Sequence, residues 1–120
     1  MSTSNALPSE PLLVACLCAQ WCGTCKDYAP QFHALQEEFP GAVFRWIDIE
    51  DESELVDPIE VENFPTLLIA TGGQARFFGT LTPHIETLKR LIRSHQAASG
   101  PGKLPASVQA LARRVAVQAV

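Results

Sequence analysis

Two cysteines separated by two residues form the part of this sequence that is best suited to chemistry. They are Cys22 and Cys25, within the segment Trp21-Cys22-Gly23-Thr24-Cys25. Two thiols at this spacing can close a small disulfide and reopen it without a cofactor. If a helix begins here, its unpaired N–H groups and its dipole stabilise a thiolate at Cys22, and Cys25 lies nearly one turn further along. The spacing therefore predicts thiol–disulfide exchange.

A pair of cysteines can also be half of a zinc site, which usually needs a second pair. The other two cysteines are Cys16 and Cys18, in the apolar run 11–19. This run predicts a buried strand, on which the two side chains share one face. A cluster of four thiolates is conceivable, although it would have to form inside the core. Buried cysteines more often act as small apolar side chains, so we expect no metal site and no bound cofactor.

Size, charge and cysteine content limit the class of protein. The chain has 120 residues, of which 47% are hydrophobic, and this is enough for one globular domain with one core. Four cysteines are too few for a disulfide scaffold, which favours a reducing, cytoplasmic location. The net charge of −4 and the lack of a basic patch with interleaved aromatic residues argue against nucleic acid. No segment approaches transmembrane length, and we expect a monomer without membrane partners.

The predicted elements follow the order β-α-β-α-β-β-α, with an extension at the end. Apolar residues recur at helical spacing over 22–39, and Pro30 inside this helix should kink it. Thr82 is expected to cap a later helix that has Pro83 at its first position. Strands are predicted over 11–19, 43–49, 66–70 and 74–78, and further helices over 51–61, from Pro83 and over 104–118.

The organisation along the chain has four parts. We predict a polar N-terminal tail over 1–10, one domain over 11–97, a linker over 98–103 and a helical extension over 104–120. The segment from Asp48 to Glu62 holds eight acidic residues and no basic one, whereas the extension carries Arg113 and Arg114. The extension also has an apolar stripe, so we expect it to fold back on the sheet face that the acidic segment borders.

The chain resembles thioredoxin from about Leu12 to His95. The resemblance implies an α/β, thioredoxin-like fold with a four-stranded mixed sheet and flanking helices, a missing or reduced N-terminal βα unit and an extra C-terminal helix. Four features carry the resemblance: the Trp21–Cys25 motif, Pro30 five residues after the second cysteine, Phe64-Pro65-Thr66 at the start of the third strand, and the turns at Gly73 and Gly79.

The resemblance also implies roles for single residues. Cys22 matches the nucleophile and Cys25 the resolving thiol of the family. Pro65 matches a cis-proline, and Phe64 offers backbone groups to a substrate strand. The remaining residues expected to contact a substrate are Trp21, Gly23 and Thr24. The implied partners are disulfide-containing client proteins and a reductase or dithiol protein that recycles the domain. The alternative is a non-catalytic interaction module that presents the Trp21/Phe64 surface to a client.

Besides the missing or reduced N-terminal βα unit, two departures from the family pattern alter these expectations. Cys16 stands where the family has a buried aspartate, and Trp46 stands where it has a nearby lysine, so the usual internal proton acceptor is missing. Thr24 replaces the proline usual inside the motif. Its hydroxyl and its N–H group favour a thiolate at Cys22, which makes the dithiol couple more oxidising.

Overall fold

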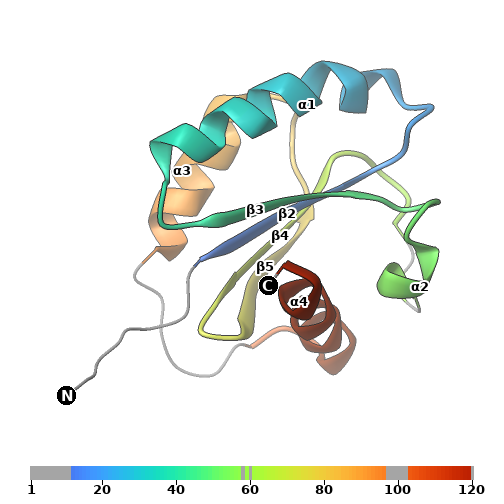
Figure 1. The fold of residues 1–120 in the computed structure, drawn as a ribbon, viewed down its shortest axis with the longest axis vertical. Coiled ribbons are helices and arrows are strands. Elements are labelled where there is room, and N and C mark those ends of the chain that lie inside the picture. Colours follow the sequence, from blue (N-terminus) through green and yellow to red (C-terminus); the bar gives the residue numbers. More distant parts are fainter. Residues whose placement is uncertain (1–11, 58, 60, 97–102, 120) are drawn as a thin grey trace.

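The protein forms one mixed β-sheet with helices on both faces (Figure 1). The computed structural model describes residues 12–57, 59, 61–96 and 103–119. The strand order is β3-β2-β4-β5, in which β2 and β3 are parallel and the other neighbours are antiparallel. The strands are β2 Leu13–Cys18, β3 Val43–Asp48, β4 Thr66–Thr71 and β5 Gln74–Thr80.

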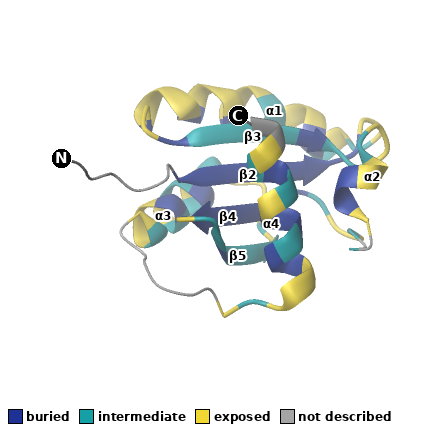
Figure 2. Ribbon diagram, turned by 60° about the horizontal axis from the view of Figure 1, so that its bottom comes forward, coloured by how far each residue is buried: buried dark blue, intermediate teal, exposed yellow. Residues whose placement is uncertain are grey.

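The two central strands are buried along their whole length (Figure 2). Strand β2 has the sequence LVACLC and β4 has TLLIAT, and helices cover the sheet on both sides. A strand that is buried on both faces is a continuous apolar run rather than an alternating one, which is why the sequence pattern identified both. The turn between β4 and β5 places Gly72 and Gly73 at φ of 58° and 75°, conformations that glycine adopts without strain.

One face of the sheet carries α1 and α3, and the other carries α2 and α4 (Figure 1). The bounds are α1 Gly23–Leu35, followed by a 3-10 turn Gln36–Glu38, then α2 Ser53–Val56, α3 Ile85–His95 and α4 Ala106–Ala119. The predicted helix over 51–61 is therefore reduced to a single turn at α2. Pro30 lies inside α1, as expected.

The predicted start of α3 is wrong. The helix begins at Ile85, and its N-cap residue is His84, which makes no side-chain capping bond. The hydroxyl of Thr82 lies 3.4 Å from that of Thr87 instead of facing a free N–H group at the helix start. The chain is still extended at His84, with φ −108° and ψ 117°, so the helix cannot begin at Pro83.

Helix α4 is docked on the sheet face that also carries α2, as predicted for the extension. Its buried side chains are Val108, Leu111, Ala112 and Val115, which join the core cluster on this face. The guanidinium of Arg114 donates hydrogen bonds to the carbonyl oxygens of Leu55 and Asp57, at 2.9 and 2.8 Å. The expected attraction to acidic side chains is thus replaced, for Arg114, by hydrogen bonds to carbonyl groups at the end of α2.

Helix α4 also bonds to the edge strand β5. The side-chain amide of Gln109 accepts a hydrogen bond from the Ala75 N–H at 2.8 Å and donates one to the Ala75 carbonyl at 3.3 Å. An edge strand otherwise leaves such groups without a partner. The tail 1–10, residues 98–102 of the predicted linker and any βα unit before Leu12 lie outside the described residues.

Candidate active site

The motif lies where strand β2 leads into helix α1. Cys22 is the N-cap residue of α1, with extended backbone angles of φ −85° and ψ 118°. Its N–H group donates to the Ala19 carbonyl at 3.1 Å, and its own carbonyl accepts from the Lys26 N–H at 3.2 Å. The turn is therefore held at both ends, and Cys22 stands at the start of the first helical turn, as the sequence predicted, without a capping hydrogen bond from its side chain.

Burial divides the four cysteines into two kinds. Cys22 is half-buried, whereas Cys25 and Cys18 are each 1% exposed and Cys16 is fully buried. The three buried residues belong to the core cluster between the sheet and the helices α1 and α3. Cys16 and Cys18 share this face of β2, as expected for residues two apart on a strand.

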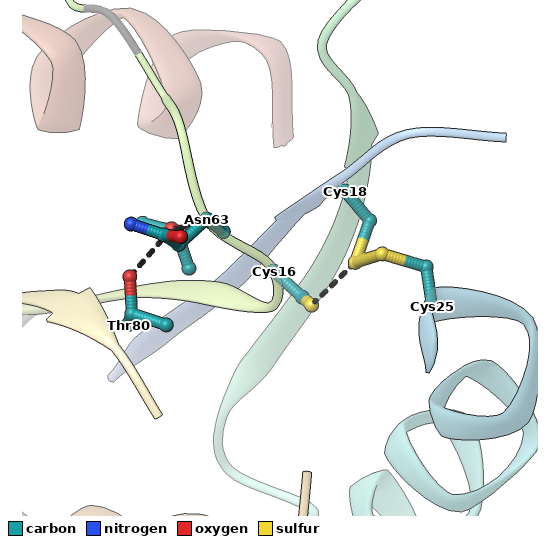
Figure 3. Close-up of a disulfide and its surroundings, with 6 residues drawn as sticks. Cys16, Cys18, Cys25, Asn63 and Thr80 are labelled. Carbon is teal, nitrogen blue, oxygen red and sulfur yellow. Dashed lines mark hydrogen bonds between the residues drawn. A yellow bond between two sulfur atoms is a disulfide. The ribbon is translucent and has the colours of Figure 1, made fainter. Parts of the chain in front are cut away.

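Cys25 forms a disulfide with Cys18, and Cys22 is a free thiol (Figure 3). The Cα atoms of Cys18 and Cys25 are 5.9 Å apart, within the usual range for a disulfide. Cys18 is therefore not an inert core thiol, which corrects the sequence-based interpretation, and Cys25 is not bonded to Cys22 in this state. The physical reason is that Cys25 is the first buried residue of α1 and packs in the same core cluster as Cys18.

Cys16 stands beside this disulfide. Its sulfur lies 3.8 Å from the Cys18 sulfur, and the proton of this contact belongs to Cys16 because Cys18 has none (Figure 3). Burial raises the pKa of Cys16 far above its ordinary value, so it remains a neutral thiol. Cys16 is thus unsuited to accept a proton, in the position where the family has an acid.

Tyr28 is the core residue that the sequence analysis missed. It is 1% exposed, and its hydroxyl has no hydrogen-bond partner within the described part of the chain. Burial, and then the neighbouring Cys16, raise the pKa of this hydroxyl. Its position three residues after Cys25 continues the apolar stripe of α1 and is the signal that could have identified it.

A pocket of about 400 Å³ adjoins Cys25 on the side of β3. Its polar lining includes Lys26 and Asp48, and Trp46 forms part of its wall. The carboxylate of Asp48 already accepts hydrogen bonds from the N–H groups of Glu50 and Asp51, at 2.9 and 3.1 Å. The pocket therefore lies next to a cysteine that is itself 1% exposed.

An aromatic pair lies next to the motif. Trp21 is 65% exposed, and its ring meets that of Phe64 edge to face with 5.6 Å between the centroids. The Phe64–Pro65 peptide bond is cis, as the resemblance implied. A side chain on Gly23 would meet no atom within 4 Å, so the glycine is not required by contacts within the fold. The structure thus brings the motif and the Phe64-Pro65 segment together.

Within the described residues, no group of three or more His, Cys, Asp or Glu side chains is arranged to hold a metal ion. No helix in the same part of the chain is long and apolar enough to cross a membrane.

Comparison with known proteins agrees with the geometry. The thioredoxin family model matches residues 4–93. Horse thioredoxin (Equus caballus) is 36% identical over 86 residues, which cover 69% of this chain and 82% of the relative. The structure of Fasciola hepatica thioredoxin superposes with a TM-score of 0.66 at 28% identity, over 72% of this chain and 82% of that one. The Schistosoma mansoni thioredoxin structure gives a TM-score of 0.64 at 26% identity, over 71% and 77%. The chain therefore belongs to the thioredoxin family and is a thiol–disulfide oxidoreductase.

Proposed function

We propose that Cys22 is the nucleophile of this enzyme and that Cys25 is the resolving thiol. One observation carries the assignment: of the four cysteines, all of which lie in the described part of the chain, Cys22 alone reaches the surface. It also stands at the N-cap position of α1, at the edge of the core that holds the other three cysteines. A partner's disulfide can therefore meet Cys22 first, and Cys25 acts from the interior, nearly one turn away.

The reaction transfers two electrons to the partner. In the reduced enzyme the Cys22 thiolate attacks one sulfur of the partner's disulfide, and the partner's other sulfur leaves as a thiolate. Cys25 then attacks the Cys22 sulfur, the partner's first sulfur leaves, and a Cys22–Cys25 disulfide forms. The partner ends with two thiols, and the enzyme with one disulfide.

The proton of Cys25 leaves through solvent. Cys16 occupies the position of the family's acid, but burial raises its pKa and keeps it protonated. The pocket that Cys25 and Asp48 both line brings solvent next to this buried cysteine. Resolution therefore depends on the fraction of Cys25 that ionises, and it speeds up as the pH rises through the thiol range.

The partner binds across the motif and the Phe64-Pro65 segment. The exposed ring of Trp21, resting on Phe64, supplies apolar contact area next to Cys22. Gly23 lets a partner's backbone approach closely, since no side chain is in the way, and Thr24 completes the contact surface. The backbone of Phe64 pairs with the partner's strand.

The partners are proteins that carry a reducible disulfide, together with a reductase or dithiol protein that regenerates the enzyme. The exchange needs only sulfur atoms of this chain, so no cofactor of its own is required. A reducing compartment such as the cytoplasm suits the proposal, because there the dithiol is kept reduced.

Insulin reduction tests the assignment. Wild type, pre-reduced and freed of reductant, is expected to reduce insulin, whereas Cys22→Ser loses the activity. Cys25→Ser is expected to accumulate a mixed disulfide with insulin that survives denaturation, because nothing resolves it. Cys16→Ala is the matched control, since it removes a buried thiol that takes no part in the proposed steps. Retained activity in Cys22→Ser would refute the assignment.

A further inference from the structure

Cys25 lies within reach of two cysteines with which it can form a disulfide. It is bonded to Cys18 on the strand, and it lies three residues after the free thiol Cys22 on the helix side. Cys18 and Cys25 are buried on the same side of the sheet, whereas Cys22 is accessible. One buried sulfur can thus exchange between an accessible cysteine and an inaccessible one.

We propose that Cys18 is a third redox-active cysteine, to which the disulfide passes after the partner has been reduced. This inference rests on the proposed roles of Cys22 and Cys25. The Cys18 thiolate attacks the Cys25 sulfur of the Cys22–Cys25 disulfide, the bond between Cys18 and Cys25 forms, and Cys22 leaves as a thiolate. The step is an isomerisation: one disulfide replaces another, no electron is gained or lost, and the proton given up by Cys18 passes to Cys22 through solvent.

Cys16 is excluded as the attacking thiol by the same geometry. Its sulfur contacts that of Cys18 at 3.8 Å, but it is not the bonded partner of Cys25. Cys18, not Cys16, is the cysteine whose sulfur is within bonding distance of Cys25, so Cys18 is the residue that can attack.

The relay gives the oxidised enzyme two forms. In the exposed form the disulfide joins Cys22 to Cys25, and a recycling thiol can attack it. In the protected form it joins Cys18 to Cys25, each 1% exposed, and Cys22 is a free surface thiol. Thiols in solution cannot reach the protected disulfide directly, so reduction requires Cys22 to attack Cys25 and restore the exposed form.

The protected form has an activity of its own. Its Cys22 can still attack a partner's disulfide, but Cys25 is already bonded and does not release that partner. The protected enzyme therefore holds the partner as a mixed disulfide until a thiol from solution attacks that bond, displaces the partner or Cys22, and so frees Cys22 again. Oxidation thus converts an enzyme that turns over into one that retains its partner.

Disulfide mapping of the full-length wild-type protein tests the proposal. The protein is oxidised with insulin as the disulfide substrate, quenched with acid, and labelled in the folded state with N-ethylmaleimide. It is then unfolded, labelled with iodoacetamide and digested with chymotrypsin without reduction. Cleavage after Trp21 separates Cys18 from the peptide that carries Cys22 and Cys25. The expected product is a cross-linked pair of peptides in which Cys22 carries N-ethylmaleimide.

The variants give the contrast. Cys18→Ala is expected to yield only an internal loop within the peptide 22–28, with no label on Cys22, while Cys16→Ala keeps the cross-linked pair. Recovery of only the internal loop from oxidised wild type would overturn the inference, and that measurement requires no variant to fold. If Cys22→Ser still reduces insulin, the proposed function fails instead. The activity and the map therefore separate the two failures.

Discussion

Truncation of Leu111 to alanine should cost a large part of the stability of this protein. Leu111 is fully buried in α4, in the core cluster that joins α4 to the sheet and to α2. Leu→Ala substitutions in such positions cost about 2–5 kcal/mol, because the lost transfer free energy is increased by the cavity left behind. A domain of this kind has a total free energy of unfolding of about 5–15 kcal/mol. The substitution therefore removes a sizeable fraction of the whole.

The size of the effect follows from the burial of the helix. Leu111 lies between Val108 and Val115, which are also buried. The cavity left by the substitution is therefore enclosed by core side chains. A loss of about 3 kcal/mol is expected, and at about 4 °C per kcal/mol for a chain of this length the melting temperature should fall by about 12 °C. The loss arises only if α4 belongs to the cooperative core and is not a separate tail.

The assay is urea unfolding followed by far-UV circular dichroism, with size-exclusion chromatography to check the oligomeric state. Val117→Ala is the matched control, because Val117 is on the same helix but is 74% exposed. Its effect should stay within about 0.5 kcal/mol. Equal midpoints for Leu111→Ala and Val117→Ala would refute the docking of α4. A fall that depends on protein concentration would show that α4 is stabilised by a second molecule instead.

Other consequences can be tested on single residues. Gln109→Ala removes both hydrogen bonds to the Ala75 backbone and should lower the free energy of unfolding by about 1–3 kcal/mol, as measured in urea. Tyr28→Phe removes a buried hydroxyl that lacks a partner in the described residues, so stability should be unchanged or higher; a loss above about 1 kcal/mol would contradict this. Burial raises the folded pKa of Cys16 above its unfolded value of about 8.5. The free energy that this buried, protonated thiol contributes to folding is therefore complete below that pH. It declines as the pH rises above that value, by up to about 1.4 kcal/mol per pH unit. The alkaline slope of the urea midpoint should therefore be shallower in Cys16→Ala, and equal slopes would argue against the burial. Cys16→Asp should raise the rate of insulin reduction near neutral pH, because it supplies a proton acceptor, and it should lower the stability of the fold. A folded variant without the gain in rate would contradict the solvent route for the Cys25 proton.

The arrangement of strands and helices was largely readable from the sequence because it depends on local periodicity. The sequences of β2 and β4 are predominantly apolar runs, as those of buried central strands are. The apolar stripe of α4 packs against the apolar side chains on the sheet face that the helix covers. The errors arose where a tertiary contact decided the outcome. Thr82 has the residue type of a helix cap, but its hydroxyl lies near Thr87, and the helix starts later.

The sequence predicted which residues form the site, but not which cysteines are bonded to one another. The spacing of Cys22 and Cys25 predicts a redox pair, and no local pattern indicates that Cys25 bonds to Cys18. That bond depends on how α1 packs against β2, which is a tertiary contact between segments and not a local pattern. One signal was present in the sequence: Cys18 and Cys25 both occupy inward-facing positions of adjacent elements, so their side chains share one core.

The loss of the buried acid and the gain of a buried disulfide have a common physical cause. The core around Cys16 is apolar enough to keep its thiol protonated, and the same core shields the Cys18–Cys25 bond from thiols in solution. An ionised aspartate in place of Cys16 would draw water and charge to the sulfur atoms and weaken that protection. Cys22 is the accessible one of the four cysteines, so in the proposed mechanism electrons enter and leave through it, and the rate of its exchange with Cys25 would set how long the enzyme stays oxidised.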